Sequence, residues 1–87
     1  MLIVTEAASI RLAAKLTGKR AGDDVAMRFV RKRRRWKLRP DKPGPEDVAF
    51  AYEGRTVLVL QPQVAQRLTD RTLDARDTPA GSRLYLR

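Results

Sequence analysis

The stretch that decides the fold is Val-Ala-Phe-Ala-Tyr-Glu-Gly-Arg-Thr-Val-Leu-Val-Leu, residues 48–60. Its first part, residues 48–52, alternates large apolar side chains with alanine, the two-residue period of a strand with one buried face. Residues 56–60 are almost wholly apolar, as in a strand that is buried on both faces. Glu53-Gly54 between them is a tight-turn dipeptide. The pattern predicts a β-hairpin over about residues 47–60.

An amphipathic helix is predicted before this hairpin, over residues 6–17. Ala8, Leu12 and Leu16 recur every four positions, which places them on one face of a helix. Thr5 precedes the helix and offers a hydroxyl as its N-cap. Gly18 is expected to follow the last turn of the helix, and residues 18–24 predict a loop.

A second hairpin is predicted between the helix and residue 42. Residues 25–31 alternate as a half-buried strand, and the alternation returns at residues 36–39. The wholly basic residues 32–35 lie between these strands as a hairpin tip. Residues 42–45 contain two prolines and a glycine and predict a loop.

The remaining elements are short. The apolar residues 2–4 predict a first strand. Pro62 begins a short helix that runs to residue 69, with Val64, Ala65 and Leu68 expected to face inward. Residues 72–75 and 82–86 predict two closing strands, joined by a turn over residues 78–81.

Composition indicates one small soluble domain spanning residues 1–87. A hydrophobic fraction of 43% is typical of a globular domain, and a chain of 87 residues forms a single core. The sequence contains no cysteine and no histidine, which excludes disulfides, thiolate chemistry and the commonest transition-metal ligands. No cofactor or metal is expected. The N-terminus has no basic segment before its short apolar run, so we expect no secretory signal, no membrane span and a cytoplasmic location.

The net charge of +9 is concentrated in one segment. Residues 28–42 contain nine basic residues and one acid, Asp41, a net charge of +8, which leaves ten basic and nine acidic residues, a net +1, elsewhere. Such a concentration attracts polyanions. The candidate polyanion-binding residues are Arg28, Arg31, Lys32, Arg33, Arg34, Arg35, Lys37 and Arg39.

Two interpretations of this basic segment remain open. It binds nucleic-acid phosphates, or it is a solvated hairpin tip whose cations prevent strands of different molecules from pairing. Trp36 among these cations is suited to stacking on a base, but its alternation with Leu38 favours packing against the core.

No catalytic residues are predicted. The acid pairs Asp23/Asp24, Glu46/Asp47 and Asp74/Asp77 lie beside expected turns and strand starts, where aspartate caps backbone groups. That role is favoured over a divalent-cation or acid–base site. Thr5 and Ser82 have no histidine to activate them. The chain is therefore not expected to be an enzyme.

The order of elements resembles the HesB/IscA-like family, the A-type iron–sulfur carriers. The resemblance is carried by Val4 to Ala8 with Leu12 and Leu16, by Glu46 to Phe50, by the turn at Gly54, and by Val57 to Val59. The helix after Pro62, Thr72 to Asp74, and Gly81 with Leu84 and Leu86 continue it to the end. The resemblance implies a mostly β fold: small mixed β-sheets, a sandwich or pseudo-barrel, with an N-terminal helix and a short second helix.

The resemblance does not extend to the cluster ligands. Family members have one cysteine in a Gly/Ser-rich loop after the second main strand and two in a short tail after the last strand. Here the first loop is expected to be shortened, residues 31–35 being Arg-Lys-Arg-Arg-Arg, and the sequence stops at Arg87 without such a tail. No cluster-ligating position can be assigned, so we expect a degenerate, cysteine-free relative.

Two functions follow from these patterns. The first is a non-catalytic interaction or scaffold domain with a carrier-like fold that has lost cluster binding and docks on a protein partner. The alternative is a basic protein that binds nucleic acid or another polyanion through the 28–42 hairpin. A homo-oligomer is compatible with either function, because the family's members dimerise.

Overall fold

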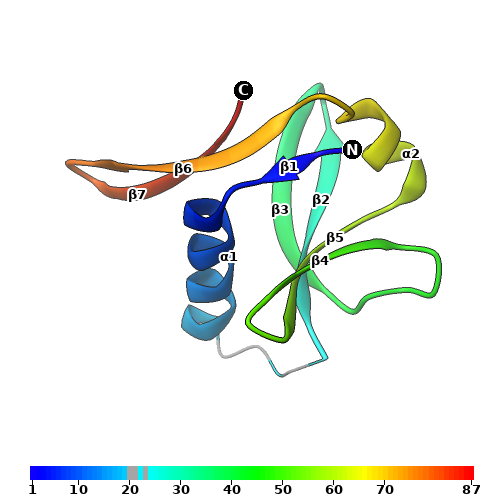
Figure 1. Ribbon diagram of the computed structural model, residues 1–87, viewed down its shortest axis with the longest axis horizontal. Helices are drawn as coiled ribbons and strands as arrows, with labels where there is room; N and C mark the ends of the chain where they lie inside the picture. The colour runs from blue at the N-terminus through cyan, green and yellow to red at the C-terminus, as the bar shows by residue number, and fades with distance from the viewer. Residues whose placement is uncertain (20–21, 23) are drawn as a thin grey trace.

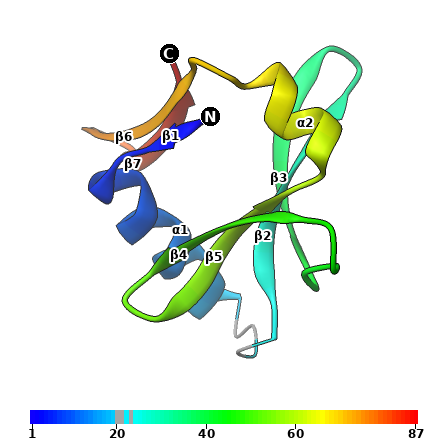
Figure 2. The same ribbon diagram turned by 45° about the vertical axis from the view of Figure 1, so that its right-hand side comes forward.

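The computed structural model describes residues 1–19, 22 and 24–87 (Figure 1). The chain forms two sheets, with strand orders β1-β6-β7 and β3-β2-β5-β4, and two helices (Figures 1 and 2). In chain order the elements are β1 (Ile3–Val4), α1 (Glu6–Gly18), β2 (Ala26–Lys32), β3 (Arg35–Asp41), β4 (Val48–Tyr52), β5 (Arg55–Leu60), α2 (Pro62–Arg67), β6 (Thr72–Thr78) and β7 (Gly81–Leu86).

The hairpin predicted at about residues 47–60 is confirmed as β4 and β5. Its two turn residues, Glu53 and Gly54, have φ angles of 51° and 80°, the left-handed region that a two-residue hairpin turn requires. The last four residues of β5 are fully buried, because β5 lies between β4 and the parallel strand β2. A β-bulge between Phe50 and Ala51 shifts the register of the pair.

The second predicted hairpin is also present, as β2 and β3. Strand β2 was predicted to be half-buried, and this is wrong for its first half. Ala26, Met27, Arg28 and Phe29 are all buried. Met27 and Phe29 pack in the core on one face of β2, and on the other face Arg28 is covered by Asp41 and Asp47. Strand β3 is an edge strand, which is compatible with Pro40 near its end.

The three-stranded sheet joins the two ends of the chain. Strand β1 pairs in parallel with β6, Ile3 opposite Thr72 and Val4 opposite Leu73, and β6 pairs antiparallel with β7. Strand β6 runs to Thr78, three residues beyond the weak strand that the sequence predicts. The added residues 76–78 pair with residues 81–83 of β7 across a two-residue turn, so the strand continues into the turn predicted over residues 78–81.

Helix α1 begins and packs as predicted. The Thr5 hydroxyl accepts a hydrogen bond from the Ala8 N–H at 3.1 Å, the geometry of an N-cap. The helix extends through Gly18, which was expected to follow its last turn. The loop predicted over residues 18–24 includes residues 20, 21 and 23, which lie outside the described residues.

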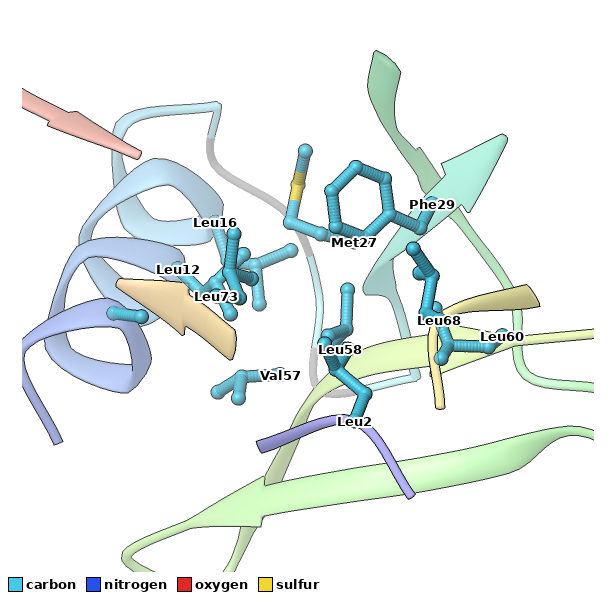
Figure 3. Close-up of a cluster of buried hydrophobic side chains, with 11 residues drawn as sticks. Leu2, Leu12, Leu16, Met27, Phe29, Val57, Leu58, Leu60, Leu68 and Leu73 are labelled. Carbon is cyan, nitrogen blue, oxygen red and sulfur yellow. The ribbon is translucent and has the colours of Figure 1, made fainter. Parts of the chain in front are cut away.

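One hydrophobic core lies between the two sheets and α1 (Figure 3). It combines Leu12 and Leu16 of α1, Met27 and Phe29 of β2, and side chains from β5, β6 and the end of α2. Leu68, just after α2, is fully buried in this core, while Val64 and Ala65 are half-buried against it, as predicted. No helix in the described part of the chain is long and apolar enough to cross a membrane. The predicted mostly β fold with two helices and small mixed sheets is confirmed.

Candidate functional site

The tip of the β2–β3 hairpin is formed by two arginines. Lys32 pairs with Arg35, and Arg33 and Arg34 between them have φ angles of 52° and 66°. Asparagine and glycine are the usual residues in such a turn, because a side chain raises the energy of the left-handed conformation. The turn therefore presents two adjacent guanidinium groups at a position that local backbone preference does not favour for arginine.

Seven of the eight candidate polyanion-binding residues are exposed, namely Arg31, Lys32, Arg33, Arg34, Arg35, Lys37 and Arg39. Within the described residues, none of the seven forms an ion pair with an acidic side chain. Lys32, Arg33, Arg35 and Lys37 face a hollow of about 440 Å³ at the tip. The hairpin is thus a cationic surface whose exposed side chains form no ion pair with an acid in the part of the chain that the structure describes.

Arg28 differs from the other seven because it is only 7% exposed. Its guanidinium donates to both carboxylate oxygens of Asp47, at 2.9 and 2.6 Å, and its Nε donates to Asp41 at 2.8 Å. A further bond at 3.2 Å runs to the carbonyl of Lys42. These contacts fasten the segment between β3 and β4 to the sheet, so Arg28 has a structural role and does not belong to the exposed cationic surface.

This network also shifts the ionisation of its members. The hydrogen bonds from Arg28 hold the pKa of the Asp47 carboxyl below its ordinary value, although burial of Asp47 acts in the opposite direction. The hydrogen bonds to Asp47 raise the pKa of Arg28. Asp47 also accepts a bond from the Gly44 N–H at 2.6 Å. The two groups are therefore a charged, hydrogen-bonded pair at neutral pH.

Trp36 is half-buried beside the cationic tip. Its ring packs edge to face against Phe29, with 5.7 Å between centroids, and the Arg31 guanidinium lies 5.1 Å from its centroid. The position of Trp36 therefore agrees with the expected packing against the core. The Arg31 guanidinium already lies over the ring on which a base would stack.

An apolar groove lies between the β2–β3 hairpin and the last strand. Its volume is about 280 Å³, and Phe29, Trp36 and Leu38 line one side. Leu73 of β6 and Leu84, Tyr85 and Leu86 of β7 line the other. We call it the apolar groove. Sequence reasoning found Trp36 and Leu38 but not the groove, because only the tertiary fold brings β7 opposite them.

Of the acid pairs that the sequence singles out, Asp24, Asp47 and Asp74 have structural contacts. Asp74 accepts from the Thr5 hydroxyl at 2.8 Å, from the Ala75 N–H, and from Tyr85 and Arg87. The Thr5 bond is the main cause that lowers the pKa of Asp74. Asp24 pairs with Lys42, and Asp23 lies outside the described residues. No group of three acidic side chains suited to a metal ion occurs in the described ranges.

Comparison with known proteins identifies the fold. No protein-family model matches the sequence, and no curated protein is significantly similar to it. Escherichia coli SufA, involved in biosynthesis of iron–sulfur clusters, superposes with a TM-score of 0.72 over 99% of this chain and 83% of its own, at 18% identity. IscA, solved with a [2Fe-2S] cluster, superposes with a TM-score of 0.65 over 100% of this chain and 84% of its own, at 19% identity.

These two structures confirm the resemblance at the level of the fold. The chain has the architecture of A-type iron–sulfur carriers from end to end, as the order of its elements predicts. It contains no cysteine at any position. The β2–β3 turn consists of Arg33 and Arg34.

Proposed function

We propose that this protein is a non-catalytic interaction domain that keeps a carrier-like fold without a cluster and docks on a protein partner. The observation that carries the proposal is the apolar groove between the edge strand β3 and β7, set in a fold that matches carriers over the whole chain. Clusters require thiolate or, less often, imidazole ligands, and these residue types are absent from the sequence. What the chain offers at this end of the fold is apolar surface and positive charge.

The groove favours a particular kind of partner. Apolar side chains on both sides suit an apolar segment, and the exposed cations of β3 beside it suit acidic residues flanking that segment. Strand β3 is also a sheet edge with backbone groups available to an added strand. We therefore infer an extended apolar segment with acidic flanks as the docking element of the partner.

Photo-crosslinking tests this proposal, with the melting temperature of each variant as a check that the fold is kept. A photoreactive aromatic amino acid replaces Trp36 at the groove, and in the control it replaces Ile10, which is 48% exposed on α1. Irradiation in the native host should give discrete protein adducts from position 36 only, and they should survive nuclease. Adducts of equal pattern from both positions, or material that nuclease removes, would contradict the proposal.

A second candidate function is polyanion binding through the exposed cations of the β2–β3 hairpin. The observation in its favour is that seven clustered cations lack acidic partners within the described residues. Phosphate contacts by exposed lysine and arginine carry affinity with little sequence preference. We rank this function second, because the apolar groove is formed by four strands from both sheets, whereas the clustered charge lies on one hairpin.

A further inference from the structure

A second hollow, distinct from the hairpin tip, gathers cations from three parts of the chain. Arg11 and Lys15 of α1, Lys37 of β3 and Arg83 of β7 line a cleft of about 590 Å³. Its remaining lining residues are Leu38, Ala80, Ser82 and Leu84, so no acidic side chain faces it in the described structure. We call this hollow the cationic cleft.

Arg11 is the residue that marks the cleft as incomplete. Its Nε atom is buried from solvent and has no hydrogen-bond partner within the described residues. A buried donor without an acceptor is unfavourable, and protein structures rarely leave one unsatisfied. An acceptor that enters the cleft from outside would complete it.

Lys15, which also lines the cationic cleft, lies in an electrostatically unfavourable environment. Burial lowers its pKa, and repulsion from Arg11 and Lys19 lowers it further. The nearest acid in the β6–β7 pairing, Asp77, lies opposite Ser82 but does not line the cleft. A negatively charged ligand would relieve the repulsion that the protein itself leaves uncompensated.

We propose that the cationic cleft binds the phosphate group of a small phosphate-bearing molecule. Four cations exceed what one carboxylate can neutralise, whereas a phosphate ester carries about −1.5 to −2 charges and three acceptor oxygens. Arginine binds such a group with paired donors and lysine as a point charge. The cleft volume falls within the range of small-molecule sites. Leu38 and Leu84 offer an apolar wall to the rest of the ligand.

The test is a titration of the ¹⁵N-labelled protein with inorganic pyrophosphate at low salt, followed by NMR. Pyrophosphate should shift the Arg11 Nε–H resonance and the amides of residues 82–84. Arg11→Gln and Arg83→Gln should each weaken binding by about tenfold, the effect of losing a charge-assisted hydrogen bond. Arg67→Gln is the matched control, because it removes one charge from an exposed residue at the end of α2, and it should change binding by less than about twofold.

Titration with a single-stranded oligonucleotide distinguishes binding at the cationic cleft from binding at the β2–β3 hairpin. If pyrophosphate leaves Arg11 unshifted at millimolar concentration while the oligonucleotide shifts only residues 31–35, which do not line the cleft, the proposal is overturned. Equal weakening by all three substitutions would also overturn it, because it would indicate attraction to net charge alone. The docking proposal is tested at Trp36, which does not line the cleft, so either proposal can fail without the other.

Discussion

Arg28 lies in the basic segment of the sequence, yet it is the one candidate residue that the fold takes out of solvent. Its partners Asp41 and Asp47 follow it by 13 and 19 positions. Burying an arginine is tolerated here because its guanidinium donates to two carboxylates and a carbonyl. Composition counts this residue as surface charge, and only the contacts reveal its structural role.

Removing the Asp47 carboxylate should destabilise the protein strongly. Asp47→Ala leaves Arg28 buried with half of its hydrogen bonds, and we expect a loss of about 3 kcal/mol in the free energy of unfolding. Chemical denaturation at pH 7 measures the loss. Asp77→Ala is the matched control, since Asp77 is exposed, and should be close to neutral. Equal effects of the two substitutions would argue against a structural role for the network.

The same pair predicts a pH dependence. The pKa of Asp47 is lower in the folded chain than in the unfolded chain, where it is about 3.9. Its contribution is therefore present above about pH 4 and lost as the pH falls through the lowered folded value. Between pH 7 and pH 2 the wild type should lose more stability than Asp47→Ala, as denaturation curves at each pH would show. Parallel pH profiles for the two proteins would contradict this.

At the scale of elements, the β2–β3 hairpin combines an unfavourable turn with a cationic tip. Replacing Arg33 by Asn, Arg34 by Gly and Arg35 by Ser supplies the preferred turn residues while removing three charges. The variant should melt at the same temperature as the wild type or higher. Any loss of polyanion binding then cannot be attributed to unfolding.

That variant tests the second function directly. If the hairpin engages about four phosphates of a duplex, binding should fall with salt at a log–log slope near −3.6, and the variant should flatten this slope. Titration of labelled RNA and duplex DNA at several salt concentrations measures it. No binding at low salt would remove the polyanion function, and unchanged binding by the variant would place the site on another surface.

Elements with strong local patterns were predictable from the sequence. The β4–β5 hairpin follows from its alternation and from Glu53-Gly54, and α1 follows from Thr5 and the spacing of Leu12 and Leu16. The full burial of the first half of β2 was not predictable, because it requires the core on one face and, on the other, Asp41 and Asp47, which follow Arg28 by 13 and 19 positions. The periodicity of a sequence indicates which face of a single strand is apolar, but it does not indicate which other segments pack against that strand.

The same limit applies to the candidate sites. The exposed cations of the hairpin were found because they are consecutive in sequence. The cationic cleft was not found, because Arg11, Lys37 and Arg83 are brought together only by the packing of α1, β3 and β7. The spacing of Arg11 and Lys15 on one helix face was the sole local indication of it.

At the scale of the whole molecule, the carrier-like fold and the absence of soft ligands lead to a negative prediction. Anaerobic reconstitution of this 87-residue protein with iron and sulfide should yield no cluster absorbance, because neither cysteine nor histidine is present. SufA treated in parallel is the positive control. A stable brown protein with cluster absorbance, after desalting and without any added partner, would refute the prediction.

The pairing of β1 with β6 has a consequence for biosynthesis. The Thr5 hydroxyl caps α1 and binds Asp74, a residue 69 positions later in the chain. A ribosome releases the N-terminal segment first, so α1 is made while its partners in β6 are still untranslated. Closing a loop of this length carries a large entropic cost and makes folding slow. The nascent chain therefore cannot complete the packing of α1 until β6 has been synthesised.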